Sequence, residues 1–405
     1  MNYVSIQKLV EHGHVSIKTG PFGTQLKASE YVSHGTPVLN VRNLGFATVN
    51  TEKLEMIGAE TLERLSAHKL MTGDIVFGRK GAVERHGFIS TDENGWMQGS
   101  DCIRLRVLTD AVNPRFLSYY FLTRRHKAFM ISMCSHGTTM ASLNQKIIEK
   151  IEVPLPERAI QDDIVEILSV FDKRISTNQK INKNLEQQAQ TLFHAWFVDY
   201  KPFGGVQPSD WKSIPVYDLA EYINGAAFKK HEYADTDKGL PIIKIAELKN
   251  GITESTQRCC VEKDPKYYIK DRDILFSWSG NPETSIDTFI WSMGDAILNQ
   301  HTFRVVSKHE APAFTFFLLK YLKPQFTHIA SNKQTTGLGH VTVTDLKRLQ
   351  FYTNRQVIKD FNDLTMPIFE MIYSNCKESQ GLSMLRDSLL PKLMSGEIDV
   401  SELDL

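Results

Sequence analysis

The stretch from Glu157 to Phe197 constrains the fold of this chain most strongly, because its 41 residues include neither glycine nor proline. Pro154 and Pro156 precede it and end whatever comes before. Apolar residues recur along it at alternating spacings of four and three, the a/d pattern of a helix that packs on another helix. The pattern predicts one helix, ~60 Å long at ~1.5 Å per residue, near the middle of the chain.

A second stretch repeats this pattern at a constant offset of 197, in residues 355–393. We expect the two apolar seams to bury each other in an antiparallel pair. Asn178 and Asn375 occupy equivalent positions near the middle of each seam. We expect them to meet and to set the register; the alternative is that each faces water at a local break. The predicted seam residues are Ile164, Leu168, Phe171, Ile175, Asn178, Leu185 and Leu192, and then Phe361, Ile368, Ile372, Asn375, Leu382 and Leu389.

The segments before the two stretches also repeat each other. Gly35–Leu44 returns as Gly239–Leu248, and Gly73–Gly81 returns as Arg272–Gly280. Matches in the same order at offsets of 197 to 205 indicate a tandem duplication. The expected fold class is α+β, with two repeated α/β domains separated by an antiparallel two-helix coiled coil, in a pseudo-two-fold arrangement. The expected boundaries are 1–156 and 201–353 for the domains, and 157–200 and 354–405 for the helices.

Composition indicates a soluble protein, with 41% hydrophobic and 23% charged residues. No apolar run reaches transmembrane length, and the first residues have no signal-peptide pattern. The five cysteines form no CxxC pair, so we expect a reduced, cytoplasmic protein. Charge is uneven: the net values are +4 for 1–156, −2 for 157–200, +2 for 201–353 and −4 for 354–405. Mildly basic globular segments suit nucleic-acid binding, although ordinary scatter of charge would also give these values.

Catalytic signatures are missing. The chain has no P-loop, GxSxG or HExxH motif. The tetrapeptide Asp264-Pro265-Lys266-Tyr267 departs from the Asn/Asp-Pro-Pro-aromatic motif of DNA amino-methyltransferases at its third residue, and no glycine-rich cofactor loop accompanies it. His12 and His14 have no third metal ligand at a suitable spacing. We therefore expect no catalytic residue, no metal and no cofactor on this chain, and a binding function.

The candidate DNA contacts lie in loops that differ between the two repeats. Gly78-Arg79-Lys80-Gly81 aligns with Ser277-Trp278-Ser279-Gly280, so each copy would present different side chains to bases or phosphates. A solvated loop is the plain alternative for any single residue. The predicted DNA-binding residues are Lys27, Arg42, Arg79, Lys80, Arg85, His86, His136, Thr138 and Thr139 in the first repeat, and Lys229, Lys230, Lys244, Trp278, Ser279, Asn281, Lys333, Gln334 and Thr335 in the second.

Over its whole length the chain resembles the specificity subunits of type I restriction-modification systems. The duplication, Gly20-Pro21-Phe22-Gly23, Thr138-Thr139 ahead of Ile151–Pro156, and the C-terminal run Leu389–Ile398 carry the resemblance. The second repeat departs from the first in Gly337-Leu338-Gly339.

This resemblance implies a non-catalytic subunit in which each target-recognition domain reads one half of a bipartite site in double-stranded DNA. It also implies that the helices set the spacing and dock two modification (methyltransferase) subunits, which restriction subunits then join. S-adenosylmethionine, ATP and Mg²⁺ would bind to those partner subunits, and no membrane is involved. The alternative from another class is a DNA-independent scaffold or inhibitor that binds methyltransferase subunits through its helices.

Overall fold

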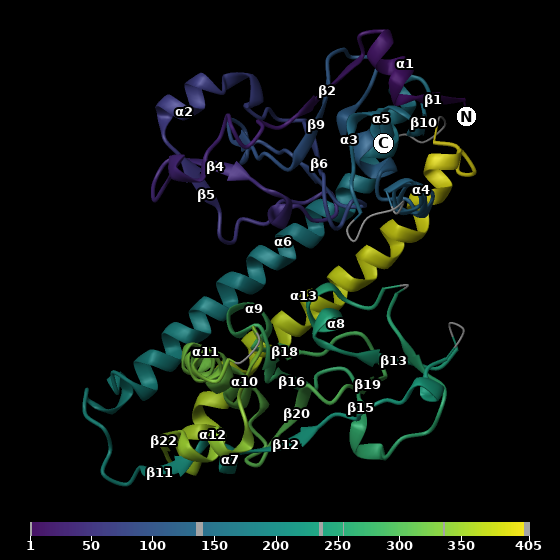
Figure 1. Ribbon diagram of the computed structural model, residues 1–405. Helices are drawn as coiled ribbons and strands as arrows, with labels where there is room; N and C mark the ends of the chain where they lie inside the picture. Colours follow the sequence, from purple (N-terminus) through teal and green to yellow (C-terminus); the bar gives the residue numbers. More distant parts are fainter. Residues whose placement is uncertain (1, 135–140, 235–237, 254, 335–336, 401–405) are drawn as a thin grey trace. The chain divides into compact units, whose positions relative to one another are not determined.

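The computed structural model describes residues 2–134, 141–234, 238–253, 255–334 and 337–400 (Figure 1). The chain forms two compact units. Unit 1 comprises Met1–Asp172 and Met384–Leu405, and unit 2 comprises Lys173–Ser383. Each unit therefore contains one globular part together with a segment of each long helix.

Unit 1 is built on a four-stranded antiparallel sheet in the order β2-β9-β6-β7. A second sheet has the order β3-β5-β4-β8, in which β4 and β8 are parallel. A third pair joins β1 and β10. The strands are β1 (Tyr3–Ser5), β2 (Val15–Thr19), β3 (Tyr31–Val32), β4 (Thr36–Leu39), β5 (Glu55–Ile57), β6 (Ile75–Gly78), β7 (His86–Phe88), β8 (Met97–Gln98), β9 (Cys102–Val107) and β10 (Glu152–Pro154).

Unit 2 repeats this arrangement, with a central sheet β12-β20-β16-β18, a second sheet β14-β13-β19-β15 and a pair β11-β22. A further pair joins β17 and β21. The strands are β11 (Lys212–Pro215), β12 (Ala220–Asn224), β13 (Leu240–Ile243), β14 (Arg258–Cys259), β15 (Tyr268–Ile269), β16 (Ile274–Ser277), β17 (Ser279–Gly280), β18 (Asp287–Ile290), β19 (Ala296–Leu298), β20 (Thr302–Ser307), β21 (Gly339–His340) and β22 (Gln350–Thr353).

The central strand of each unit shows why its sequence is apolar throughout. In β6, Ile75 and Phe77 pack in one core cluster while Val76 packs in another, on the opposite face of the sheet. Leu275 in β16 likewise lies in a different cluster from its neighbour Phe276. A strand covered on both faces needs apolar residues at every position rather than at alternate ones. The same strand order and burial in both units confirm the predicted duplication.

Short helices cover the sheets. Those of unit 1 are α1 (Ile6–Glu11), α2 (Ala59–Arg64), α3 (Pro114–Tyr120), α4 (Arg124–Cys134) and α5 (Gln145–Glu149). Those of unit 2 are α7 (Val216–Leu219), α8 (Ile245–Asn250), α9 (Pro282–Ser285), α10 (Pro312–Tyr321), α11 (Lys323–Asn332) and α12 (Val343–Arg348). Single 3-10 turns occur at Ala28–Glu30, Val41–Asn43, Ser66–His68, Lys201–Phe203, Lys230–Glu232 and Pro265–Tyr267.

The two long helices are α6 (Arg158–Phe197) and α13 (Arg355–Ser395). The first begins one residue later than predicted, and Pro367 and Gly381 do not interrupt the second. Within unit 2 their segments run antiparallel, because Arg174 bonds to Glu378 while Asn182, further along α6, reaches the earlier residue Ile372. None of the helices in the described part of the chain is both long and apolar enough to cross a membrane.

The asparagines of the helix pair bond crosswise rather than directly to each other. Asn178 Nδ2 donates to Ser379 Oγ at 3.2 Å, and Asn375 Nδ2 donates to Asn182 Oδ1 at 2.8 Å. Asn178 reaches Asn375 only through the backbone oxygen, at 3.5 Å. Because the repeat offset of 197 relates Asn178 to Asn375 and Asn182 to Ser379, the two side-chain bonds are equivalent. The direct side-chain pair that the sequence suggested is thus replaced by two related pairs.

Much of the predicted seam packs into the globular cores as well as against the other long helix. Ile164 and Leu168 join the core of unit 1 together with α3. Phe361 and Ile372 join the core of unit 2. The periodicity located the apolar face correctly but could not show that α3 and α10 share in covering it. Seam residues of both long helices share each cluster, so the expected packing of seam on seam is confirmed, and the globular cores add to their burial.

Candidate nucleic-acid interface

One edge of the central sheet of unit 1 gathers most of the predicted loops. Thr19 pairs with Ile103 and Gly78 pairs with Cys102, so the ends of β2 and β6 lie beside the start of β9. The start of β7 lies at the same edge. The segments that follow β2 and β6, and those that precede β7 and β9, therefore leave the sheet together. We call this the loop edge of unit 1.

Unit 2 has the equivalent loop edge. Asn224, the last residue of β12, pairs with Phe303, and Ser277, the last residue of β16, pairs with Thr302. β18 begins at this edge, where Asp287 pairs with Ser277. The loops after β12 and β16 and before β20 thus occupy the same places as their counterparts in unit 1.

A further segment, distant in sequence, joins each loop edge. The Leu143 amide donates to Arg79 O at 2.8 Å, and Lys80 pairs with Ser142 in a single bridge. In unit 2 the Val341 amide donates to Trp278 O at 2.9 Å, and β17 pairs with β21. The fold therefore brings the chain that follows α4 or α11 against the loop after the central strand.

Close backbone contacts explain two glycines that recur in the repeat. A Cβ atom at Gly20 would lie 2.0 Å from Gly99 O, and one at Gly225 would lie 2.3 Å from Asn299 O. Real Cβ atoms do not approach an oxygen so closely, so only glycine fits at either position. This contact holds the loop after the first strand against the segment that precedes β9 or β20.

Unit 1 contains five predicted cationic residues, three of which lie at the loop edge. Arg79, Lys80 and Arg85 belong to the loop between β6 and β7, and Lys80 and Arg85 are exposed. Lys27 is exposed in the segment after β2. Arg42 forms a 3.0 Å ion pair with Glu55, so its charge is partly balanced.

His86 corrects the prediction for this loop. Its side chain is fully buried, and its Nε2 lies 2.9 Å from Ser118 Oγ. Burial holds the pKa of His86 well below its usual range, so the imidazole is neutral. A side chain sealed in the core cannot contact DNA. The charged neighbour Arg85 made the loop look uniformly exposed, whereas β7 has already begun at His86.

In unit 2, Trp278 and Ser279 are half-buried at the loop edge, and Lys229 and Lys230 are exposed after β12. The side chain of Asn281 caps α9, where its Oδ1 accepts from the amides of the next turn. Capping occupies that oxygen and favours a structural role for Asn281.

The remaining predicted residues of unit 2 are engaged or lie elsewhere. Lys244 Nζ donates to Gln257 and lies 5.7 Å from the Tyr233 ring centroid. Lys333 Nζ bonds to both carboxylate oxygens of the buried Asp345 at 2.6 Å, so its charge stabilises the fold. Gln334 is exposed. His136, Thr138, Thr139 and Thr335 lie outside the described residues.

Several side chains at or near the loop edges were not among the predicted DNA-binding residues. Phe46 in unit 1 is 44% exposed, with the Arg85 guanidinium 5.6 Å from its ring centroid. His301 and His340 flank Trp278 in unit 2. The sequence offered one sign that Phe46 could be exposed in a loop: it directly follows a glycine, Gly45. The sequence offered no sign that His301 and His340 lie together, because their positions are 39 apart in the chain.

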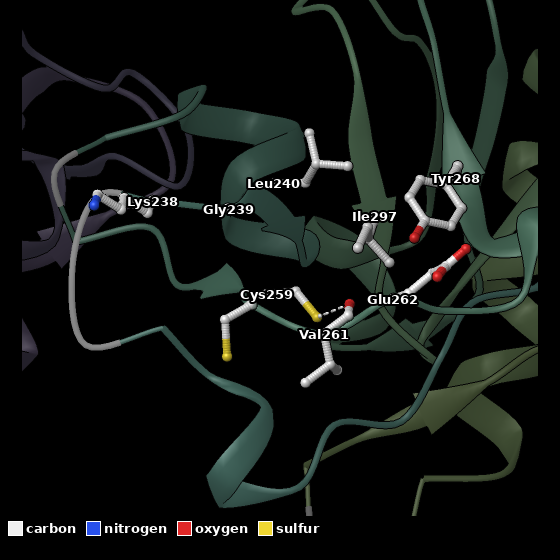
Figure 2. Close-up of a pocket in the computed structure, with 9 residues that line it drawn as sticks. Lys238, Gly239, Leu240, Cys259, Val261, Glu262, Tyr268 and Ile297 are labelled. Carbon is white, nitrogen blue, oxygen red and sulfur yellow. Dashed lines mark hydrogen bonds between the residues drawn. The ribbon is translucent and has the colours of Figure 1, made fainter.

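Unit 2 has a cavity of about 350 Å³ lined by residues of β13, β14, β15 and β19. Figure 2 shows the side chains around it. Its lining is mixed: Leu240, Val261 and Ile297 are apolar, while Lys238 and Glu262 are charged. Cys259 Sγ donates to Val261 O at 3.3 Å beside it. None of the predicted DNA-binding residues lines this cavity. Among the residues that the structure describes, no three His, Cys, Asp or Glu side chains gather as metal ligands.

Two copies of an α+β domain, each with its loops collected at one sheet edge and each followed by a long helix, define a duplicated binding protein. The family described as "Type I restriction modification DNA specificity domain" matches the chain twice, over residues 37–187 and 208–353. These matches cover more than half of the sequence. The chain belongs to this family: it is a specificity subunit of a type I restriction-modification system, with a role in DNA recognition, and the family is non-catalytic.

Individual relatives agree with this assignment. The type I restriction enzyme MjaIX specificity subunit of Methanocaldococcus jannaschii is 27% identical over 314 residues, which are 73% of this chain and 71% of the relative. The HindI specificity subunit of Haemophilus influenzae is 20% identical, covering 85% of this chain and 90% of that one. The crystal structure of the type I S subunit from M. genitalium shares the fold, with a TM-score of 0.51 and 14% identity over 97% of this chain and 96% of that one.

Proposed function

We propose that each unit reads one half of a bipartite site in double-stranded DNA, and that the long helices set the distance between the halves and dock modification subunits. The observation that carries this proposal is the presence of two equivalent loop edges with different side chains. Arg79 and Lys80 stand where unit 2 has Trp278 and Ser279. Two readers with different side chains would recognise two different half-sites.

The chemistry of the loop edges supports DNA as the ligand. Arginine and lysine contact phosphates and guanine edges, and amide and hydroxyl side chains contact other base edges. Each mismatched base pair costs ~1–3 kcal/mol, so a few contacts per unit give limited discrimination. When two units are linked, the free energies by which each rejects wrong bases add together. This favours a recognition site in two parts.

The exposed surface of α13 supports docking of protein partners. Leu364 and Met371, one heptad apart, are 47% and 52% exposed. Apolar side chains aligned along a helix are suited to a groove or helix of another protein. In this proposal the partners are two modification subunits, later joined by restriction subunits. S-adenosylmethionine, ATP and Mg²⁺ bind to those partners.

Deleting one heptad from each long helix tests the spacing role. Residues 175–181 and 373–379 face each other across the helix pair. Their removal shortens each helix by ~10 Å, or about three base pairs at ~3.4 Å each. Mapping methylated bases in cells that carry the whole complex should show a spacer about three base pairs shorter, with both half-sites retained.

The matched control keeps the helix length and removes the same central hydrogen bonds, as in the double variant Asn178→Ala with Asn375→Ala. It should retain the original spacer. An unchanged spacer in the deletion variant would refute the ruler role. A methylating complex with no recurrent sequence motif would instead favour a scaffold that does not read DNA.

A further inference from the structure

Unit 2 carries a compact group of aromatic and polar side chains at its loop edge. The Trp278 ring centroid lies 5.8 Å from that of His301 and 6.5 Å from that of His340. Asn224 Oδ1 accepts from Trp278 Nε1 at 3.2 Å, and Gln300 Nε2 lies 3.2 Å from His301 Nε2. These residues come from four segments: the end of β12, the loop after β16, the loop before β20, and β21.

The strand registers identify the equivalent positions in unit 1. Arg79 follows β6 as Trp278 follows β16, and Asp101 precedes β9 as His301 precedes β20. Thr19 ends β2 as Asn224 ends β12. Ser142 pairs with Lys80 as His340 pairs with Ser279. The same four places thus hold Thr19, Arg79, Asp101 and Ser142 in one unit and Asn224, Trp278, His301 and His340 in the other.

We propose that these four places, together with Gln300, determine which bases each unit reads; the assignment rests on the proposed function above. Every place lies at the loop edge, and every place differs in chemistry between the units. In contrast, the glycines that position the edge, Gly20 and Gly225, are the same. Two domains that share a backbone but differ in the side chains at the loop edge would recognise different base sequences.

The side chains indicate the bases. In unit 1, the Arg79 guanidinium matches guanine O6 and N7, and the exposed carboxylate of Asp101 accepts from cytosine N4. The half-site of unit 1 therefore includes a specified G·C pair. In unit 2, the Gln300 amide and the imidazole beside it combine donor and acceptor atoms that match adenine N6 and N7. The half-site of unit 2 therefore includes a specified A·T pair.

The histidines are not needed to hold the core together. His301 is exposed, and its neighbours are the Trp278 ring and Gln300 at the rim of the sheet. Trp278 is supported from below by Phe303, at a centroid distance of 5.7 Å. Asn224 is a positioning residue, because its hydrogen bond holds the indole and through it the histidines. Substitution of His301 therefore removes a reading side chain and leaves the fold intact.

The test uses the complete complex, with the modification subunits co-expressed and methylated bases mapped across genomic DNA. His301→Ala should relax one position of one half-site by about ten-fold in methylation preference, the loss of a base contact. The other half-site should keep its sequence. His309→Ala is the matched control, because His309 follows β20 at its opposite end.

Asp101→Ala in unit 1 should relax the opposite half-site from the one that His301→Ala relaxes. Asp110→Ala, beyond the far end of β9, is its control. Identical motifs in wild type, His301→Ala and Asp101→Ala would overturn the assignment of these places, and so would relaxation of the same half-site by both variants. A wild-type complex without any two-part motif would instead overturn the proposed function.

Discussion

The two units solve the same packing problem with opposite chemistry where the long helices meet α3 or α10. In unit 1, Asp172 accepts from Arg115 at 2.8 Å, from the Tyr119 hydroxyl at 2.6 Å and from Arg386 at 2.8 Å. In unit 2 the equivalent residues are Phe369, Ala313, Phe317 and Ala189, all of them buried. A network of ions and hydrogen bonds in one unit thus stands where the other has an apolar cluster.

A second difference lies beneath the central sheet. Phe77 of unit 1 packs near two buried imidazoles, those of His86 and His126. In unit 2 the ring of Phe326 takes the place of His126, with its centroid 4.9 Å from that of Phe276. The two units thus share strand register and helix position but differ in the polarity of their interiors. At these matched positions, stability should therefore depend on charge in unit 1 and on packed volume in unit 2.

Phe369→Ala in unit 2 should have the largest effect. Removing a fully buried phenylalanine loses its apolar contacts and leaves a cavity, at a cost of about 4 kcal/mol. Hydrogen exchange of the β16 amides, measured at equilibrium, should report the loss. Leu364→Ala, at an exposed position of the same helix, is the control and should change little. Unaltered exchange in β16 would contradict the packing role of Phe369.

Asp172→Ala in unit 1 should cost about 3 kcal/mol, because two largely buried guanidiniums lose their shared carboxylate. Hydrogen exchange of the β6 amides should measure this loss of stability. The informative companion is the quadruple variant Asp172→Phe, Arg115→Ala, Tyr119→Phe and Arg386→Ala, which copies the pattern of unit 2. It should recover most of the lost stability, since apolar replacement of a buried ionic network is often neutral. If the quadruple variant were less stable than Asp172→Ala, the Asp172 site of unit 1 and the Phe369 site of unit 2 would not be structurally equivalent.

Acid should weaken unit 1 more than unit 2. Burial lowers the pKa of His126 to about 3, against an ordinary value of 6.5. Between these values the unfolded chain binds a proton that the folded chain does not, so stability is complete above pH 6.5 and falls as the pH drops below it. The cost from His126 at pH 5 is about 2 kcal/mol.

His126→Phe, which copies Phe326, should remove this part of the acid sensitivity. The measurement compares intrinsic-rate-corrected exchange protection of β6 and β16 amides at pH 8 and pH 5. Wild type should lose protection in β6 and keep it in β16, since none of the described histidines of unit 2 is buried. Equal losses in both strands would show that the buried imidazoles do not govern acid stability.

The two bonds between the helices should have the smallest effects: Asn375→Ala should cost about 1 kcal/mol, for one partly buried hydrogen bond to Asn182. Ser379→Ala, at the equivalent bond, should cost less, because Asn178 Nδ2 keeps Glu378 as an acceptor at 2.8 Å. Ser374→Ala, on the exposed face of the same helix, is the control. Exchange of amides near the centre of α13 measures all three. A larger cost for Ser379→Ala would overturn this ranking.

Local signals predicted local structure well. Asn113-Pro114 marked the start of α3, where the Asn113 side chain accepts from two amides. The chain forms two helices here, α3 and α4, rather than one, because the Thr123 hydroxyl donates to Tyr120 O and accepts from the His126 amide, which turns the chain between them. Hydroxyls that compete with helical hydrogen bonds in this way are hard to recognise in sequence, since their partner depends on tertiary packing.

At the loop edges, too, some residues could be predicted from the sequence and others could not. The sequence identified Arg79, Lys80 and Trp278 because the repeat places unlike residues at matched positions. It could not identify His301 and His340, whose approach to Trp278 depends on strands paired from distant parts of the chain.

The duplication and the two long helices could be predicted from the sequence, because they follow from repeat spacing and periodicity. The need for glycine at positions 20 and 225 emerged only in the folded chain, since it rests on contacts with Gly99 O and Asn299 O. Tertiary structure alone decided which side chains the helix seams meet, that His86 is buried, and that Asp172 gathers two arginines where unit 2 gathers apolar side chains. Those outcomes depend on contacts between residues far apart in the chain, and burial and charge pairing are properties of the contact rather than of either residue alone.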